Sequence, residues 1–310
     1  MVAVVVASSL AGYLARKRRW CPESHARRIT WLGMVYVVPL ASLLPVWSLR
    51  MSWQDVWLPV QCVILTFVCL GIGLATAGLH RMSRPDAGAY SYAAAHSNIG
   101  VTMGGFVCLT LFGEKGLALS LIYLTFWTML MFGVFFPLAG AFAGRPVRFG
   151  AMGFLRSLLD IRCISLPAII LGLALNVAGV ARPGWIDRWH VVDILVILNN
   201  AVMFFVIGLT LHLSRLKDYM AECASLSLIK FVASPIAAVG LIWLVTAAGF
   251  RLDSLRVNVM LVESAMPTAV FAVVAANLYG LNARLASLLF VINTAVFLAL
   301  VLPVIMAIRW

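Results

Sequence analysis

Glu263 and Pro267 stand four residues apart inside an apolar run that covers residues 257–278. A carboxylate is costly to bury in apolar surroundings without a partner, and a proline removes a backbone donor and breaks or kinks a helix. The pair predicts a broken helix at which Glu263 responds to a proton or a cation. The alternative is a structural pairing of Glu263 with His96 or Lys230.

A second polar cluster lies in the segment that begins at residue 96, HSNIGVTMGG. His96, Ser97, Asn98 and Thr102 are candidate contacts for a solute or ion. Gly100, followed by glycines at 104 and 105, weakens any helix here much as a proline would. Irregular backbone survives at membrane depth only where it lines a cavity or is buried in protein. This segment is therefore predicted to be a second break.

The remaining candidates are single polar residues in apolar runs: Ser264, Thr268, Lys230, Asn199 and Asn293. Each has a plainer structural alternative. Serine and threonine often bond to their own helix, and a lysine near a helix end can extend to the membrane surface. Asparagine can hydrogen-bond between helices without touching a solute.

The elements that hold these residues are predicted to span a membrane. The chain has 310 residues, of which 63% are hydrophobic and 11% charged, and its mean hydropathy is +1.03. These values are far from those of soluble domains. The net charge of +12 does not indicate nucleic-acid binding, because the basic residues lie between apolar runs. The six cysteines have no metal-ligand spacing, so neither a metal nor another cofactor is expected.

Ten apolar segments are long enough to be candidate spans. They cover residues 1–15, 29–49, 56–79, 89–112, 117–142, 163–181, 191–213, 223–249, 257–279 and 285–308. Fifteen Lys and Arg residues fall in one alternating set of loops and seven in the other set with the C-terminus. This bias places both termini outside the cytoplasm of a plasma membrane, the inner membrane in a bacterium.

An internal repeat relates the two predicted breaks. Residues 96–113 align without a gap with residues 263–280, serine falls on serine, and the ends read LFG and LYG. Both segments belong to the fourth span of a set of five. The predicted fold is all-α, with ten spans in a 5+5 inverted repeat and broken helices at 89–112 and 257–279. The predicted parts are a first repeat at 1–143, a cytoplasmic connecting loop at 144–162 and a second repeat at 163–310.

Short motifs along nearly the whole chain resemble the auxin efflux carrier family, which includes bacterial malonate and malate permeases and plant auxin exporters. They are GYLAR at 12–16, YVVPL at 36–40, NIG at 98–100 with LFG at 111–113, LP at 166–167, IGL at 207–209, Lys230 with Pro235, MP at 266–267 and LYG at 278–280. Their order along the chain carries the resemblance.

The resemblance implies a scaffold and a mobile transport part, with broken helices that cross at the centre. Asn98 and Pro267 match the family's crossover positions, and the implied substrates are organic anions. In the family a proline usually follows the asparagine by seven residues, whereas this chain has Gly105 there. Glu263 does not come from the family pattern.

These observations predict a secondary transporter for a small mono- or dicarboxylate that works by alternating access and is coupled to protons through Glu263. The alternatives are sodium coupling, a bile-acid-type symporter, a cation/proton antiporter, and a membrane scaffold or sensor. The chain contains no P-loop and no HExxH motif, so no enzyme activity is predicted. The expected partners are the anion, the lipid bilayer and a second copy of the chain in a homodimer.

Overall fold

The structure is a computed structural model that describes residues 2–144, 165–210, 219–308 and 310. Its regular elements in these ranges are helices, and no strand occurs among them. The predicted connecting loop at 144–162 lies, apart from its first residue, outside the described part. Each of the ten predicted apolar segments contains helix where it is described.

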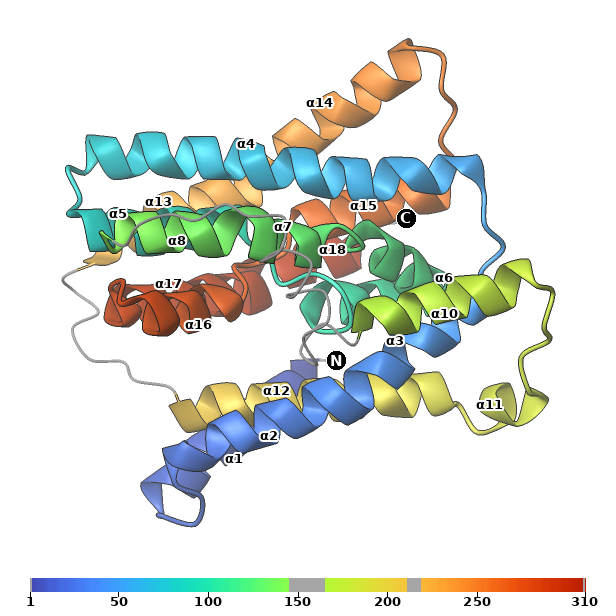
Figure 1. Ribbon diagram of the computed structural model, residues 1–310, viewed down its shortest axis with the longest axis horizontal. Helices are drawn as coiled ribbons and strands as arrows, with labels where there is room; N and C mark the ends of the chain where they lie inside the picture. The colour runs from blue at the N-terminus through green and yellow to red at the C-terminus, as the bar shows by residue number, and fades with distance from the viewer. Residues whose placement is uncertain (1, 145–164, 211–218, 309) are drawn as a thin grey trace.

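The helices form two groups, one mostly below the other in Figure 1, which meet at the right of the view. The first, here called the α12 group, packs along the lower edge of the view. It contains α1 (Val2–Lys17), α2 (Ala26–Leu32), α3 (Val38–Trp47), α10 (Ser165–Val177), α11 (Gly184–Arg188) and α12 (Val191–Thr210). Close packing explains two glycines of this group, because a Cβ on Gly12 would overlap the backbone of Phe205 and one on Gly208 that of Ser9.

The second, here called the crossover group, lies mostly above the first in Figure 1, with α4 running across its upper part. Its first half contains α4 (Trp57–Leu79), α5 (Arg84–Ala95), α6 (Met103–Tyr123), α7 (Trp127–Leu130) and α8 (Phe136–Phe142). Its second half contains α13 (Met220–Leu228), α14 (Ser234–Ala247), α15 (Ser254–Ser264), α16 (Phe271–Tyr279), α17 (Ala283–Val296) and α18 (Leu302–Ala307).

In the part of the chain that the structure describes, four π-helical turns join neighbouring helices, and each ends two residues before a proline. They are η2 (Gly33–Val37), η4 (Met131–Phe135), η7 (Ile229–Ala233) and η8 (Phe297–Val301), which precede Pro39, Pro137, Pro235 and Pro303. Proline has no N–H and clashes with the carbonyl four residues earlier. A wider turn accommodates that defect, so long apolar helices continue past their prolines.

Within the described ranges, six helical stretches are long and apolar enough to cross a membrane: 28–47, 53–79, 103–123, 191–210, 220–247 and 283–307. Shorter apolar helices cover 133–142 and 165–177. The stretch 103–123 is not one straight helix, because Gly113 has φ 67° and ψ −161° and reverses the chain there. α6 is therefore a hairpin with two arms, which the prediction had divided between two spans.

Candidate functional site

Two unwound segments cross at the centre of the crossover group. Residues 96–102 separate α5 from α6, and residues 265–270 separate α15 from α16. They pair as a short antiparallel bridge between Ser97 and Thr268. The Asn98 N–H donates to the Pro267 carbonyl at 2.7 Å, and the Ala269 N–H donates to the His96 carbonyl at 3.0 Å. Each segment thus satisfies backbone groups that the other leaves without a helical partner.

The first break forms without a proline. Gly100 has φ +76°, a left-handed conformation that L side chains rarely adopt. Downstream, the Gly104 N–H donates to the Asn98 carbonyl at 3.0 Å. The Asn98 side chain accepts a hydrogen bond from the Thr102 hydroxyl at 2.5 Å. Glycine flexibility and local side-chain bonds therefore do here what a proline does at the second break.

Asparagines on neighbouring helices hold the broken backbone in place. The Thr268 N–H donates to Asn293 Oδ1 at 2.8 Å, and Asn293 Nδ2 donates to the Ser227 hydroxyl at 3.2 Å. The Thr268 hydroxyl donates to the Ala93 carbonyl and lies 3.2 Å from the His96 carbonyl. Thr268 is fully buried and Asn293 almost fully buried. In this conformation, the polar groups of Thr268 and Asn293 are taken up by backbone groups at the two breaks, by the end of α5 and by Ser227.

Asn199 and its neighbour Asn200 differ in what they contact. Asn200 Nδ2 donates to the Val101 carbonyl at 3.0 Å and so supports the first break from α12. Asn199 is fully buried, but its side-chain atoms have no hydrogen-bond partner among the described residues. The sequence singled out Asn199 as the candidate for the site, whereas in this conformation Asn200 is the asparagine that reaches the crossover.

Glu263 is buried between the two arms of the α6 hairpin. Ser120, on the second arm, donates its hydroxyl hydrogen bond to Oε1. Cys108 Sγ, on the first arm, lies 4.0 Å from the same oxygen. Gly104 leaves room for the carboxylate, because a Cβ there would overlap Oε2. Oε2 has no hydrogen-bond partner within the described part of the chain.

Lys230 is the buried cation at the crossover. It lies on η7 with no exposed surface, and its Nζ donates to the Ser97 hydroxyl at 2.9 Å. No carboxylate of the described residues lies within 4.0 Å of it, so the structural pairing of Glu263 with Lys230 is absent in this conformation. Lys230 does not extend to the membrane surface. An ammonium group that shares one hydroxyl retains donors that could bind an anion.

His96 is packed among aromatic rings. Its ring stacks on Tyr92 at 4.3 Å and meets Phe135 edge to face at 4.2 Å, and Nδ1 lies 3.0 Å from the Tyr92 carbonyl. Nε2 has no partner among the described residues. The other structural alternative for Glu263, a pairing with His96, is also absent.

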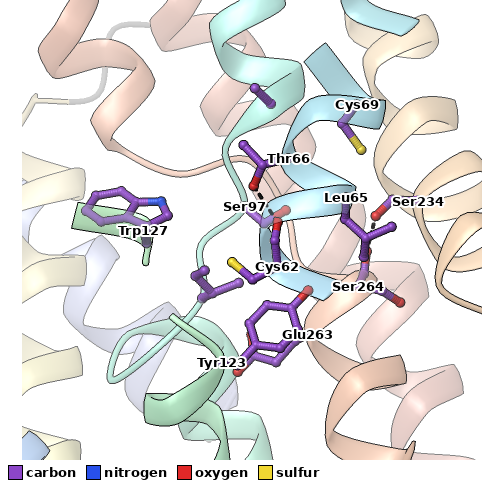
Figure 2. Close-up of a pocket in the computed structure, with 12 residues that line it drawn as sticks. Cys62, Leu65, Thr66, Cys69, Ser97, Tyr123, Trp127, Ser234, Glu263 and Ser264 are labelled. Atoms are coloured by element: carbon purple, nitrogen blue, oxygen red, sulfur yellow. Dashed lines mark hydrogen bonds between the residues drawn. The ribbon is translucent and has the colours of Figure 1, made fainter. Parts of the chain in front are cut away.

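A small cavity adjoins the crossover, with a volume of about 20 Å³. That is room for about one water molecule. Figure 2 shows four lining residues from α4 along one wall and Trp127 standing apart from them. The lining comprises Cys62, Leu65, Thr66, Cys69, Ala95, Ser97, Ile99, Tyr123, Trp127, Ser234, Glu263 and Ser264.

Three of the twelve lining residues were predicted to belong to the site: Ser97, Glu263 and Ser264. The Ser264 hydroxyl bonds back to the Leu261 carbonyl at 2.6 Å, while its own carbonyl accepts from Ser234 at 2.7 Å. The α4 wall was not predicted, because its cysteines and threonine look like ordinary small residues of an apolar helix. Ser120 was also missed, and its only signal was a hydroxyl in the apolar sequence LALSLIY.

The arrangement places a buried carboxylate and a buried ammonium group beside the same pair of broken helices. Ionisable groups inside a membrane are costly and usually mark ion or solute pathways. The cavity, which Glu263 and Ser97 help to line, is too small for a dicarboxylate, so this conformation is closed around the crossover. Binding such a solute requires the helices around the cavity to rearrange.

The long apolar helices and the buried polar crossover define a multi-pass membrane protein. The sequence profile of a family described as "Membrane transport protein" matches residues 148–306, about half of the chain. The chain belongs to this family, which confirms the predicted relationship to auxin efflux carriers. It is also 28% identical over 314 residues to an uncharacterized transporter from Methanocaldococcus jannaschii, covering 97% of this chain and 96% of that protein. The protein is therefore a membrane transporter.

Proposed function

We propose that the protein is a secondary active transporter that moves a small organic anion, a mono- or dicarboxylate, by alternating access. The observation that carries this proposal is the crossing of two broken helices beside Lys230 and Glu263. Lys230 offers a positive charge to a carboxylate group of the solute. Ser97, which accepts from Lys230, is the contact that the solute replaces.

Glu263 is the proposed coupling group. A carboxylate that leaves water favours its neutral form, so binding a proton is a way to bury it. Cys108 and Ser120 face it from the two arms of α6, and Cys62 and Tyr123 line the same cavity. Protonation of Glu263 accompanies anion binding, and the proton and the anion are both released on the opposite side of the membrane. No other carboxylate lies among the described lining residues.

The proposed architecture is ten spans in two inverted sets of five, with both termini outside the cytoplasm of the plasma membrane. Its support is local. α5 packs against α16 and α6 against α15, as two crossing broken helices require. Gly113 and Gly280, which end the two aligned segments, both have positive φ, at 67° and 76°. A glycine with positive φ thus ends both half-helices, although ψ differs between them, at −161° for Gly113 and 30° for Gly280.

The test is uptake of radiolabelled malonate, malate and an indole carboxylate into proteoliposomes under an inward proton or sodium gradient. We expect accumulation of at least one carboxylate under the proton gradient and its loss when a protonophore collapses that gradient. Accumulation that follows sodium alone would reassign the coupling ion. If none of the three anions moves under either gradient, the proposed substrate class is wrong.

A further inference from the structure

A partly buried ion pair joins the two helix groups on one face of the molecule. Arg182, in the turn between α10 and α11, binds both oxygens of Glu114 on α6, with Nη2 to Oε2 at 3.1 Å. Ser48, at the end of α3, donates to Glu114 Oε1 at 3.2 Å. A planar guanidinium on a carboxylate in this two-point geometry is a strong and directional contact.

The location of Glu114 connects this contact to the candidate site. Glu114 follows Gly113 at the tip of the α6 hairpin, and the arms of that hairpin hold Glu263 through Ser120 and Gly104. At about 1.5 Å per residue, the tip lies roughly 9–14 Å along the arms from those contacts. Among the described helices, the main contacts between the α12 group and the crossover group are those of α6 with α3 and α12.

The ion pair is built so that it can open at low cost. If Glu114 leaves, Arg182 keeps Asp187 and the Leu44 carbonyl, at 2.9 Å, as partners. The Glu114 side chain is already 29% exposed and can be hydrated. Neither group is then left buried and unpaired, which is the main penalty for breaking an ion pair inside a protein.

A second ion pair shows the contrast. Arg256 binds Asp55 at 2.7 Å, with side chains 10% and 2% exposed. It joins α15 to the segment that precedes α4, so both partners lie in the crossover group. Separating them would leave Asp55 buried. This pair fastens one group internally, whereas Arg182–Glu114 joins the two groups.

We propose that Glu114 and Arg182 form a reversible latch that closes this face of the transporter. Engaged, the latch holds the α6 tip against α3 and keeps the crossover closed on this side. Released, it lets the hairpin move away from the α12 group and opens the cavity toward this face. The inference rests on the proposed alternating access, and its test needs no transported solute.

The test measures how fast a membrane-impermeant thiol reagent, applied from the Arg182 face, labels Cys62 in oriented proteoliposomes. Cys62 lines the cavity and is kept as the only native cysteine. We expect Glu114→Gln to raise the labelling rate at least about fivefold, a typical size for a conformational coupling. Arg182→Gln should do the same. The double variant should label no faster than the faster single variant, because both changes remove one contact.

Two controls separate a latch from general loosening. Glu222→Gln makes the same chemical change on α13 and should leave the labelling rate at the wild-type value. Arg256→Gln should lower thermal stability without raising labelling from this face. The latch would be overturned if Glu114→Gln labelled at the wild-type rate, or if the increases in labelling rate of the two single variants added up in the double variant. Absence of carboxylate uptake combined with the expected labelling pattern would refute the substrate proposal and leave the latch standing.

Discussion

At the scale of single residues, the fit between Gly104 and Glu263 decides where the carboxylate lies. A Cβ at position 104 would occupy the place of Oε2. The contact joins the first residues of α6 to the last turn of α15, so the two broken helices meet at this point. Gly104 does not have a left-handed backbone conformation. A glycine is required at this position only because a side chain would overlap the carboxylate.

Gly104→Ala should displace the Glu263 carboxylate. We expect proton-driven flux to fall about tenfold or more, because small displacements of a positioned group are costly. Gly240→Ala is the matched control, since Gly240 is a helical glycine with open space where the Cβ would lie. The measurement is uptake in proteoliposomes at equal protein content. Equal uptake by both variants would contradict the importance of this contact.

Residue chemistry also limits what the sequence could predict. Glu263 and Lys230 were recognisable because a charge in an apolar run is rare. Ser97, the partner of Lys230, was recognisable as part of a polar cluster. Ser120, the partner of Glu263, was not, because a lone serine in an apolar run usually bonds to its own helix. Which of Asn199 and Asn200 contacts the first break depends on the rotation of α12 about its axis. The sequence does not determine this rotation, because two adjacent residues of the same type fit either orientation.

At the scale of elements, the breaks themselves were predictable and the bonds that hold them were only partly so. Pro267 and Gly100 mark positions where a helix loses a donor or gains a left-handed residue. The pairing of Asn98 with the Pro267 carbonyl involves segments about 170 residues apart in sequence, and periodicity carries no information on such contacts. The hydrogen bond from the Thr268 N–H to Asn293 was predicted only in general terms, because the sequence suggested for Asn293 either a contact with the solute or a hydrogen bond between helices.

Asn293→Ala should destabilise the second break. It removes the acceptor of the Thr268 N–H, and a buried donor without a partner costs about 1–3 kcal/mol. Asn277→Ala is the control, because Asn277 is exposed and bonds within its own helix, so its loss should cost less than about 0.5 kcal/mol. The free energy of unfolding in detergent micelles distinguishes the two. Similar small losses for both variants would show that Asn293 does not support the break.

At the scale of the whole molecule, composition predicted a membrane protein and the order of motifs predicted its family. The separation into an α12 group and a crossover group was not visible in the sequence beyond the family's implied scaffold. It depends on contacts such as those between α1 and α12, where glycines allow close approach. The Arg182–Glu114 contact was missed for the same reason, since each residue alone looks like an ordinary loop charge.

The central claim is that a proton bound at Glu263 drives the movement of an organic anion through the crossover. The most direct measurement is carboxylate uptake by Glu263→Gln proteoliposomes as the pH outside is lowered, beside wild type and the control Glu222→Gln. The neutral amide mimics the protonated acid and cannot exchange a proton. We predict that wild type and Glu222→Gln take up more anion as the outside pH falls, whereas Glu263→Gln shows no dependence on the gradient. Full gradient-driven uptake by Glu263→Gln would contradict the account.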